Sequence, residues 1–173
     1  MICDGVLCAT DRVVRSTIHR LVRLLLLSVV AGSCGSSAPR AYVPELGELM
    51  LFQQMRHAKL WLAAEADNWP LAEYEVEELQ EGFDTIVAYH PTHEGSPVAP
   101  KDAIPRMITV PLADLRDAVR RKDRALFAER YDALTSACNG CHKATNFGFN
   151  QVQRPSSNPY PNQVFSAQPP DLN

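Results

Sequence analysis

The chain has little of several features that mark other classes of protein. Its five cysteines in 173 residues are too few for a disulfide-stabilised scaffold. Its formal net charge of −3 argues against nucleic acid as a partner, because no strongly basic surface is available. No segment alternates polar and apolar residues, so no β-sheet is expected. Hydrophobic residues nevertheless make up 46%, which excludes wholesale disorder and, at this length, suits one domain with extensions.

The N-terminal region has no apolar run long enough for a transmembrane helix, which needs about 20 residues. Its run of eight, residues 24–31, follows four arginines and precedes a series of small residues, which is the order of a secretory signal. We interpret residues 1–40 as a signal segment and tether, and we expect export to the periplasm. Cys34 stands where a bacterial lipoprotein signal has its lipidated cysteine. A lipid anchor at Cys34 and plain cleavage with release are the two alternatives.

Four segments have apolar residues spaced three and four apart, which predicts amphipathic helices. Their ranges are 45–67, 70–89, 109–121 and 124–145. Asn68 and Asp123 are suited to cap the second and fourth helices, and residues 91–108, with four prolines, are expected to form a loop. The short connections predict an all-α fold, an antiparallel four-helix bundle over residues 41–145. Residues 146–173 are expected to form an irregular, Pro-rich tail.

The sequence Cys-Asn-Gly-Cys-His at residues 138–142 is a C-x-x-C-H motif, the attachment signal for c-type haem. Residues i and i+3 lie on one side of a helix, so the thiols of Cys138 and Cys141 can reach the two vinyl groups of one porphyrin. His142 then offers its imidazole to the iron as the proximal ligand. Random placement of the five Cys and five His gives this motif in about one such chain in 250.

Three rival roles for the motif fit less well. A thioredoxin-like redox pair would want a βαβ context, which the helical pattern does not provide. A structural zinc site needs four ligands, and only a couple of distant His accompany the two Cys. A Cys138–Cys141 disulfide would close a tight loop and stabilise little. The sequence therefore predicts one covalently bound haem c.

The residues around the motif resemble a known family. The resemblance covers roughly residues 115–145 and is carried by DAV at 117–119, DRALF at 123–127, YDAL at 131–134 and the motif itself. This stretch looks like the last two helices of cytochrome c prime and its low-spin relatives. The resemblance implies a periplasmic four-helix haem protein of electron-transfer or gas-binding type, often dimeric. The chain departs from the family in its long second connection and in the length of its tail.

The first helix should face the distal side of the haem in such a bundle. His57 lies at the centre of the apolar arc of this helix and Met50 two turns earlier, and both residue types ligate haem iron. His57 is the first candidate for the sixth ligand and Met50 the second. Five-coordinate iron is a further alternative, as is Met55 if the helix phase differs. His90 and His93, in a loop, are expected to be exposed to solvent.

Further side chains are candidates for contact with the haem. Arg56 is a candidate partner of a haem propionate, against the interpretation that it lies on a solvated face. Trp61 and Tyr131 are candidates to line the haem, against ordinary core packing. Aromatic residues of the tail are expected to fold over the haem edge; these are Phe147, Phe149, Tyr160 and Phe165.

These observations predict an exported monohaem c-type cytochrome that carries single electrons between redox partner proteins and is not an enzyme. The alternative is a cytochrome c prime-like protein that binds NO or CO at a vacant distal site. A small haem peroxidase ranks last, because the sequence offers no distal acid–base pair beyond His57 and Arg56.

Overall fold

The computed structural model describes residues 41–167, which contain five helices and no strand. The helices are α2 (Leu46–Glu65), α3 (Trp69–Tyr89), α4 (Pro100–Met107), α5 (Thr109–Arg121) and α6 (Arg124–Ala144). The predicted all-α class is therefore confirmed for this part of the chain. The predictions for residues 1–40, including the signal segment and the lipid anchor at Cys34, lie outside the described residues, as do residues 168–173.

The helix ends follow from local chemistry that the sequence already shows. The Asn68 side chain accepts a hydrogen bond from the Leu71 N–H (3.2 Å) and caps α3. The Asp123 carboxylate accepts one from the Leu126 N–H (3.0 Å) and caps α6. Both predicted caps are confirmed. Helix α5 ends where Lys122 adopts the left-handed conformation (φ 55°), which turns the chain directly into α6.

The prediction of a loop over residues 91–108 is wrong for its second half, where α4 spans Pro100–Met107. Pro100 occupies the first turn, where its missing N–H has no helical partner to lose. Burial of Ala103 and Ile104 then fixes this short helix against the core. Ile108 alone separates α4 from α5, and its N–H donates to the Ile104 carbonyl (2.9 Å).

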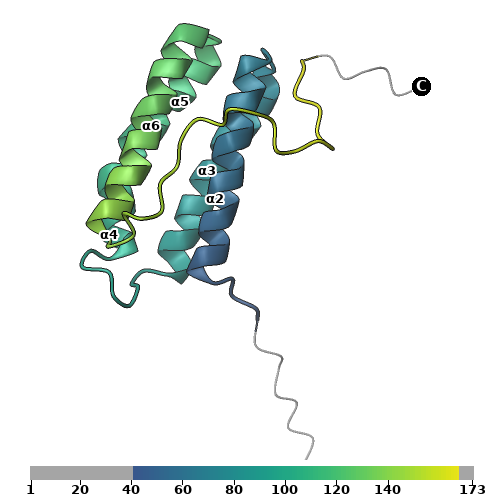
Figure 1. Cartoon of the computed structure of the whole chain (residues 1–173). Coiled ribbons are helices and arrows are strands. Elements are labelled where there is room, and N and C mark those ends of the chain that lie inside the picture. The colour runs from purple at the N-terminus through teal and green to yellow at the C-terminus, as the bar shows by residue number, and fades with distance from the viewer. Residues whose placement is uncertain (1–40, 168–173) are drawn as a thin grey trace, which may run out of the picture. The chain divides into compact units, whose positions relative to one another are not determined.

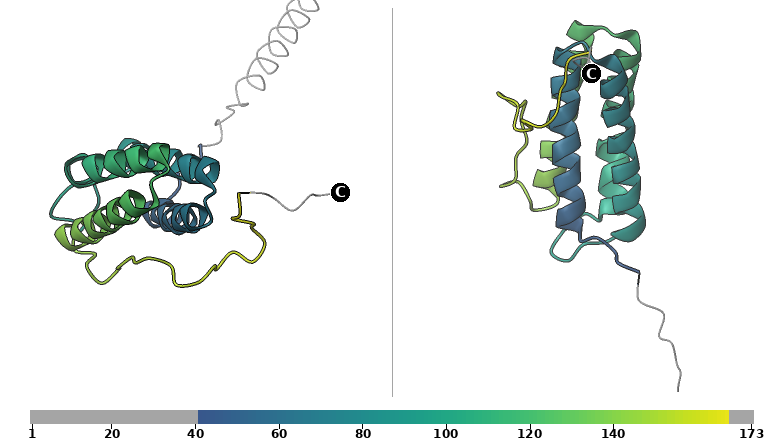
Figure 2. Two further views of the ribbon diagram at one scale, coloured as in Figure 1. Left: turned by 90° about the horizontal axis from the view of Figure 1, so that it is seen from above. Right: turned by 90° about the vertical axis from the view of Figure 1, so that its right-hand side faces the viewer.

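The helices pack as two pairs within residues 43–167. Helix α2 packs along α3 and α5 along α6, while α3–α5 and α2–α6 contacts join the pairs (Figures 1 and 2). Helix α4 contacts α3, α5 and α6 at one end. None of the helices in the described part of the chain has the length and hydropathy needed to cross a bilayer. The core is made by the predicted periodic positions, among them Leu60, Val76, Ile86, Leu115, Phe127 and Leu134.

The tail from residue 145 to 167 is irregular, as predicted, and runs back over the helices (yellow in Figure 1). Arg154 attaches it to α6 through two hydrogen bonds of 2.6 Å to the Asp132 carboxylate. The Arg154 guanidinium also lies over the Trp61 ring of α2, 4.3 Å from its centroid. Further on, Phe165 is buried and the Asn68 amide donates to the Ser166 carbonyl (3.3 Å). The tail is thus part of the packed structure.

Candidate cofactor site

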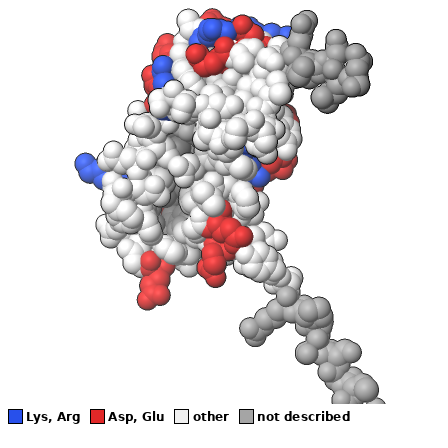
Figure 3. All heavy atoms as spheres, turned by 45° about the vertical axis from the view of Figure 1, so that its right-hand side comes forward, with Lys and Arg blue, Asp and Glu red and all other residues white. Residues whose placement is uncertain are grey.

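A cavity of about 560 Å³ lies between α2, α3, α4, the end of α6 and the start of the tail. Its volume falls in the usual range for small-molecule and cofactor sites. Most of the lining is apolar and includes Leu79, Phe83, Ile104 and Leu134. On the face shown in Figure 3, uncharged residues surround a hollow, and charged side chains gather mainly at the two ends of the molecule.

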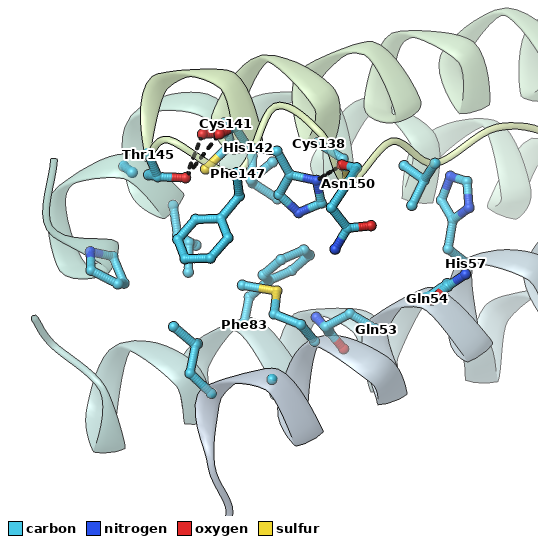
Figure 4. Close-up of a pocket in the computed structure, with 18 of the residues that line it drawn as sticks. Gln53, Gln54, His57, Phe83, Cys138, Cys141, His142, Thr145, Phe147 and Asn150 are labelled. Atoms are coloured by element: carbon cyan, nitrogen blue, oxygen red, sulfur yellow. Dashed lines mark hydrogen bonds between the residues drawn. The ribbon is translucent and has the colours of Figure 1, made fainter. Parts of the chain in front are cut away.

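The functional residues of the C-x-x-C-H motif all line this cavity. Cys138 and Cys141 lie one turn apart near the end of α6, are half-buried and are not disulfide-bonded. His142 follows, and its ring points into the cavity (Figure 4). The structure therefore brings the two thiols and the imidazole to one apolar space, as the helical spacing predicts.

Burial keeps both thiols protonated at neutral pH. It raises the pKa of Cys138 to about 12, with the neighbouring Cys141 adding to the effect. It also raises the pKa of Cys141, against a smaller opposing effect of Arg106. Because the thiolate is the reactive and metal-binding form, these side chains are poor spontaneous nucleophiles.

The tautomer of His142 follows from its single hydrogen bond. Its Nδ1 lies 2.6 Å from the Asn150 carbonyl oxygen, which can only accept, so Nδ1 carries the hydrogen. The lone pair of the neutral ring is then on Nε2, which has no hydrogen-bond partner within residues 41–167. A metal-binding histidine has this arrangement, in which the second nitrogen donates to a carbonyl and fixes the ring.

These features fit haem c. Two thiols at i and i+3, an adjacent imidazole with an available Nε2 and an apolar cavity are the groups that covalent attachment and proximal ligation need. No group of three or more His, Cys, Asp or Glu side chains in the described part of the chain is placed to hold a metal ion by itself.

His57 lines the cavity from α2, but both of its ring nitrogens are engaged with α6. The Thr135 hydroxyl donates to the Tyr131 carbonyl (2.8 Å), so it accepts from His57 Nε2–H (2.9 Å). The Tyr131 hydroxyl then faces two acceptors, His57 Nδ1 and the His57 main-chain carbonyl, each at 2.9 Å, and shares its single proton between them. The two rings stack with centroids 4.3 Å apart. Burial lowers the pKa of His57 to about 4, so the ring is neutral. Iron ligation through Nε2 would require loss of the Thr135 bond and the proton.

The two loop histidines lie differently from the prediction, whereas the methionines lie on the faces of the first helix that its periodicity indicates. Met50 lines the cavity and is half-buried, whereas Met55 is not among the lining residues. His93, expected to be exposed, is half-buried, lines the cavity and lies 5.5 Å from the Phe147 ring. His90 is also half-buried and donates to the Pro44 carbonyl (2.7 Å). The expectation of exposure is wrong for both.

Arg56, Trp61 and Tyr131 do not line the cavity. Arg56 forms an ion pair with Glu78 of α3 (2.7 Å). The Trp61 ring packs against Tyr131, which is fully buried in the core. The structure thus favours ordinary packing for the two aromatics and a pairing between helices for the arginine.

The tail aromatics divide into two groups. Phe147 and Phe149 line the cavity, Phe147 half-buried and Phe149 84% exposed. Tyr160 and Phe165 pack against each other, with ring centroids 6.5 Å apart, and do not line the cavity.

Two residues with clear roles at the site are absent from the sequence prediction. Thr135 could have been found, because it lies one turn after Tyr131 on the helix that faces His57. Asn150 acts through its main-chain carbonyl, which leaves no trace in the sequence. Comparisons with protein-family models, curated proteins and solved structures found no match, so the resemblance to cytochrome c prime stays a prediction.

Proposed function

We propose that the chain is an exported monohaem c-type cytochrome that carries single electrons. The observation that carries this proposal is the convergence of Cys138, Cys141 and the Nε2 lone pair of His142 on one apolar cavity. When bound, haem c supplies the one-electron Fe(III)/Fe(II) couple. In this proposal the helices form an antiparallel four-helix bundle in which α4 and α5 together take the place of the third helix.

The residues of the chain have separate tasks in this proposal. Cys138 and Cys141 would hold the porphyrin through thioether bonds, each formed by addition of the S–H across a vinyl C=C bond without a leaving group. His142 would hold the iron through Nε2. The apolar lining, including Phe83 and Phe147, excludes water and disfavours the more highly charged ferric state.

The decisive experiment is production of the full chain in a host with a haem c maturation system. We expect a red protein whose denatured mass includes one haem, retained after extraction with acidic acetone. Cys138→Ser and Cys141→Ser together should abolish covalent attachment, whereas the matched Cys34→Ser should retain it. A colourless wild-type protein of unmodified mass would overturn the proposal.

Gas binding is the second candidate, and the hydrogen bonds of His57 favour it. If Nε2–H of His57 stays bonded to Thr135, this ring does not ligate the iron, and the distal site is open unless Met50 occupies it. A high-spin ferrous spectrum with rapid CO uptake supports this function. A low-spin spectrum unchanged by CO supports electron transfer.

Two variants identify the sixth ligand of a low-spin protein. Met50→Leu and His57→Phe each remove one candidate while keeping a similar apolar volume. The variant that converts the spectrum to high spin identifies the ligand. If neither does so, both assignments are wrong.

The proposal also includes a periplasmic location and redox partner proteins. The lipid anchor is tested separately with Cys34→Ser. Loss of membrane association in this variant supports the anchor, and unchanged association rejects it.

A further inference from the structure

The start of the tail is held to α6 by side chains that lie one turn apart on that helix. Asn139 Nδ2 donates to the Val152 carbonyl (2.9 Å), and the Val152 N–H donates to Asn139 Oδ1 (2.9 Å). One side chain therefore satisfies both main-chain groups of one tail residue. On the next turn, His142 Nδ1–H donates to the Asn150 carbonyl. Because Asn139 and His142 belong to one rigid helix, these contacts fix residues 150–152 relative to the imidazole.

Residues 150–152 are also fixed by contacts just before and just after them in the chain. The Phe147 N–H donates to the His142 carbonyl (2.6 Å) and the Asn150 N–H to the Phe147 carbonyl (2.9 Å), which forms a turn directly after α6. Beyond residue 152, Arg154 is attached to Asp132. The Asn150 carbonyl is thus fixed by contacts on both sides of it in the chain. Of the other α6 side chains that bond to the tail, Asn139 is the nearest to His142 in sequence.

We propose that Asn139 is a positioning residue that acts on His142 through the tail. The two hydrogen bonds between Asn139 and Val152 keep the Asn150 carbonyl in place to accept from His142 Nδ1–H. This bond to the carbonyl sets the tautomer and the orientation of the imidazole ring. The effect on iron rests on the proposed function: a hydrogen bond from Nδ1–H makes the imidazole a stronger donor and stabilises the ferric state. The effect on the chain itself does not depend on haem.

The test uses the full chain produced with the maturation system, as wild type, Asn139→Ala and Asn139→Asp. Alanine removes both bonds to Val152 and preserves the helix, since it has the higher helix propensity. Aspartate keeps the acceptor for the Val152 N–H and loses the donor to its carbonyl. The matched control is Asn158→Ala, because Asn158 also bonds a tail N–H, that of Tyr160 (2.7 Å), and makes no contact with His142.

We expect hydrogen exchange at the Val152 amide to accelerate about tenfold or more in Asn139→Ala, the effect of losing about 1.4 kcal/mol of local hydrogen bonding. Asn139→Asp should fall between wild type and Asn139→Ala. The reduction potential should rise and the ferrous Fe–His stretching frequency should fall in Asn139→Ala. Asn158→Ala should change none of these values.

The outcomes separate this proposal from the proposed function. A wild-type chain without haem defeats the proposed function, but Val152 exchange and the His142 tautomer, read from ¹⁵N shifts, still decide the role of Asn139. Wild-type values of exchange and potential in a haem-loaded Asn139→Ala would overturn the positioning role and leave the cytochrome intact. If Asn139→Ala does not fold, the same comparison with Asn139→Asp gives the decision.

Discussion

Acidification of the haem-free chain should destabilise it through His57. The folded state keeps this imidazole neutral, because burial lowers its pKa from 6.5 to about 4. Between these values the unfolded state binds a proton that the folded state does not, so stability falls as pH falls. Above pH 6.5 the contribution of His57 is fully present. At pH 4 the loss amounts to about 3 kcal/mol, at about 1.4 kcal/mol per pKa unit.

Urea unfolding followed by far-UV circular dichroism at pH 7, 6, 5 and 4 measures this loss. The comparison is between wild type and His57→Gln, which does not titrate but retains a donor and an acceptor for Thr135 and Tyr131. Other groups, such as the buried Glu75, are common to both chains and cancel in the difference. The difference in unfolding free energy should shrink toward low pH by about 3 kcal/mol. Parallel pH profiles would refute the reasoning, because they would show that folded His57 titrates as an exposed histidine does.

Three further substitutions, and Gly47→Ala as a control for the first of them, test the packing and the charges. Gly82→Ala should destabilise the chain by about 1–3 kcal/mol in thermal unfolding, because its Cβ would collide with the Gln53 side chain; Gly47→Ala, with open space around its Cβ, should be neutral or stabilising. Glu75→Gln should raise stability at pH 7, since burial raises the pKa of this carboxyl, and the gain should vanish as acid protonates Glu75 in the native wild type. Arg154→Ala should speed chymotryptic cleavage of the tail but change unfolding free energy by about 1 kcal/mol or less, because this ion pair is largely exposed. An equal or slower rate of tail cleavage in Arg154→Ala would contradict the prediction for that variant. A rise in thermal stability of Gly82→Ala would contradict the prediction of a steric clash.

The periodic part of the fold could be predicted from the sequence. The inward positions of α3, such as Val76 and Ile86, and the caps at Asn68 and Asp123 are local features, visible in spacing and residue type. Helix α4 could not be predicted, because a proline-rich segment by itself favours a loop. The helix depends on burial of Ile104 in a core that other segments form.

Of the candidate site, only the arrangement of the C-x-x-C-H motif could be predicted. Its two cysteines and its histidine lie within about one turn of a single helix, so their closeness in space follows from their spacing alone. The bonds of His57 to Thr135, of His142 to Asn150 and of Asn139 to Val152 join segments by tertiary packing. No periodic pattern encodes such pairings, and a main-chain acceptor has no signature in residue type.

The short helix α4 has a consequence for the local stability of the cavity wall. Pro105 has no N–H to donate within this helix of eight residues, so α4 has fewer internal hydrogen bonds than the long helices α2 and α6. We therefore expect local fraying at this wall to need less free energy than opening of the long helices, and the amides of α4 to exchange hydrogen faster.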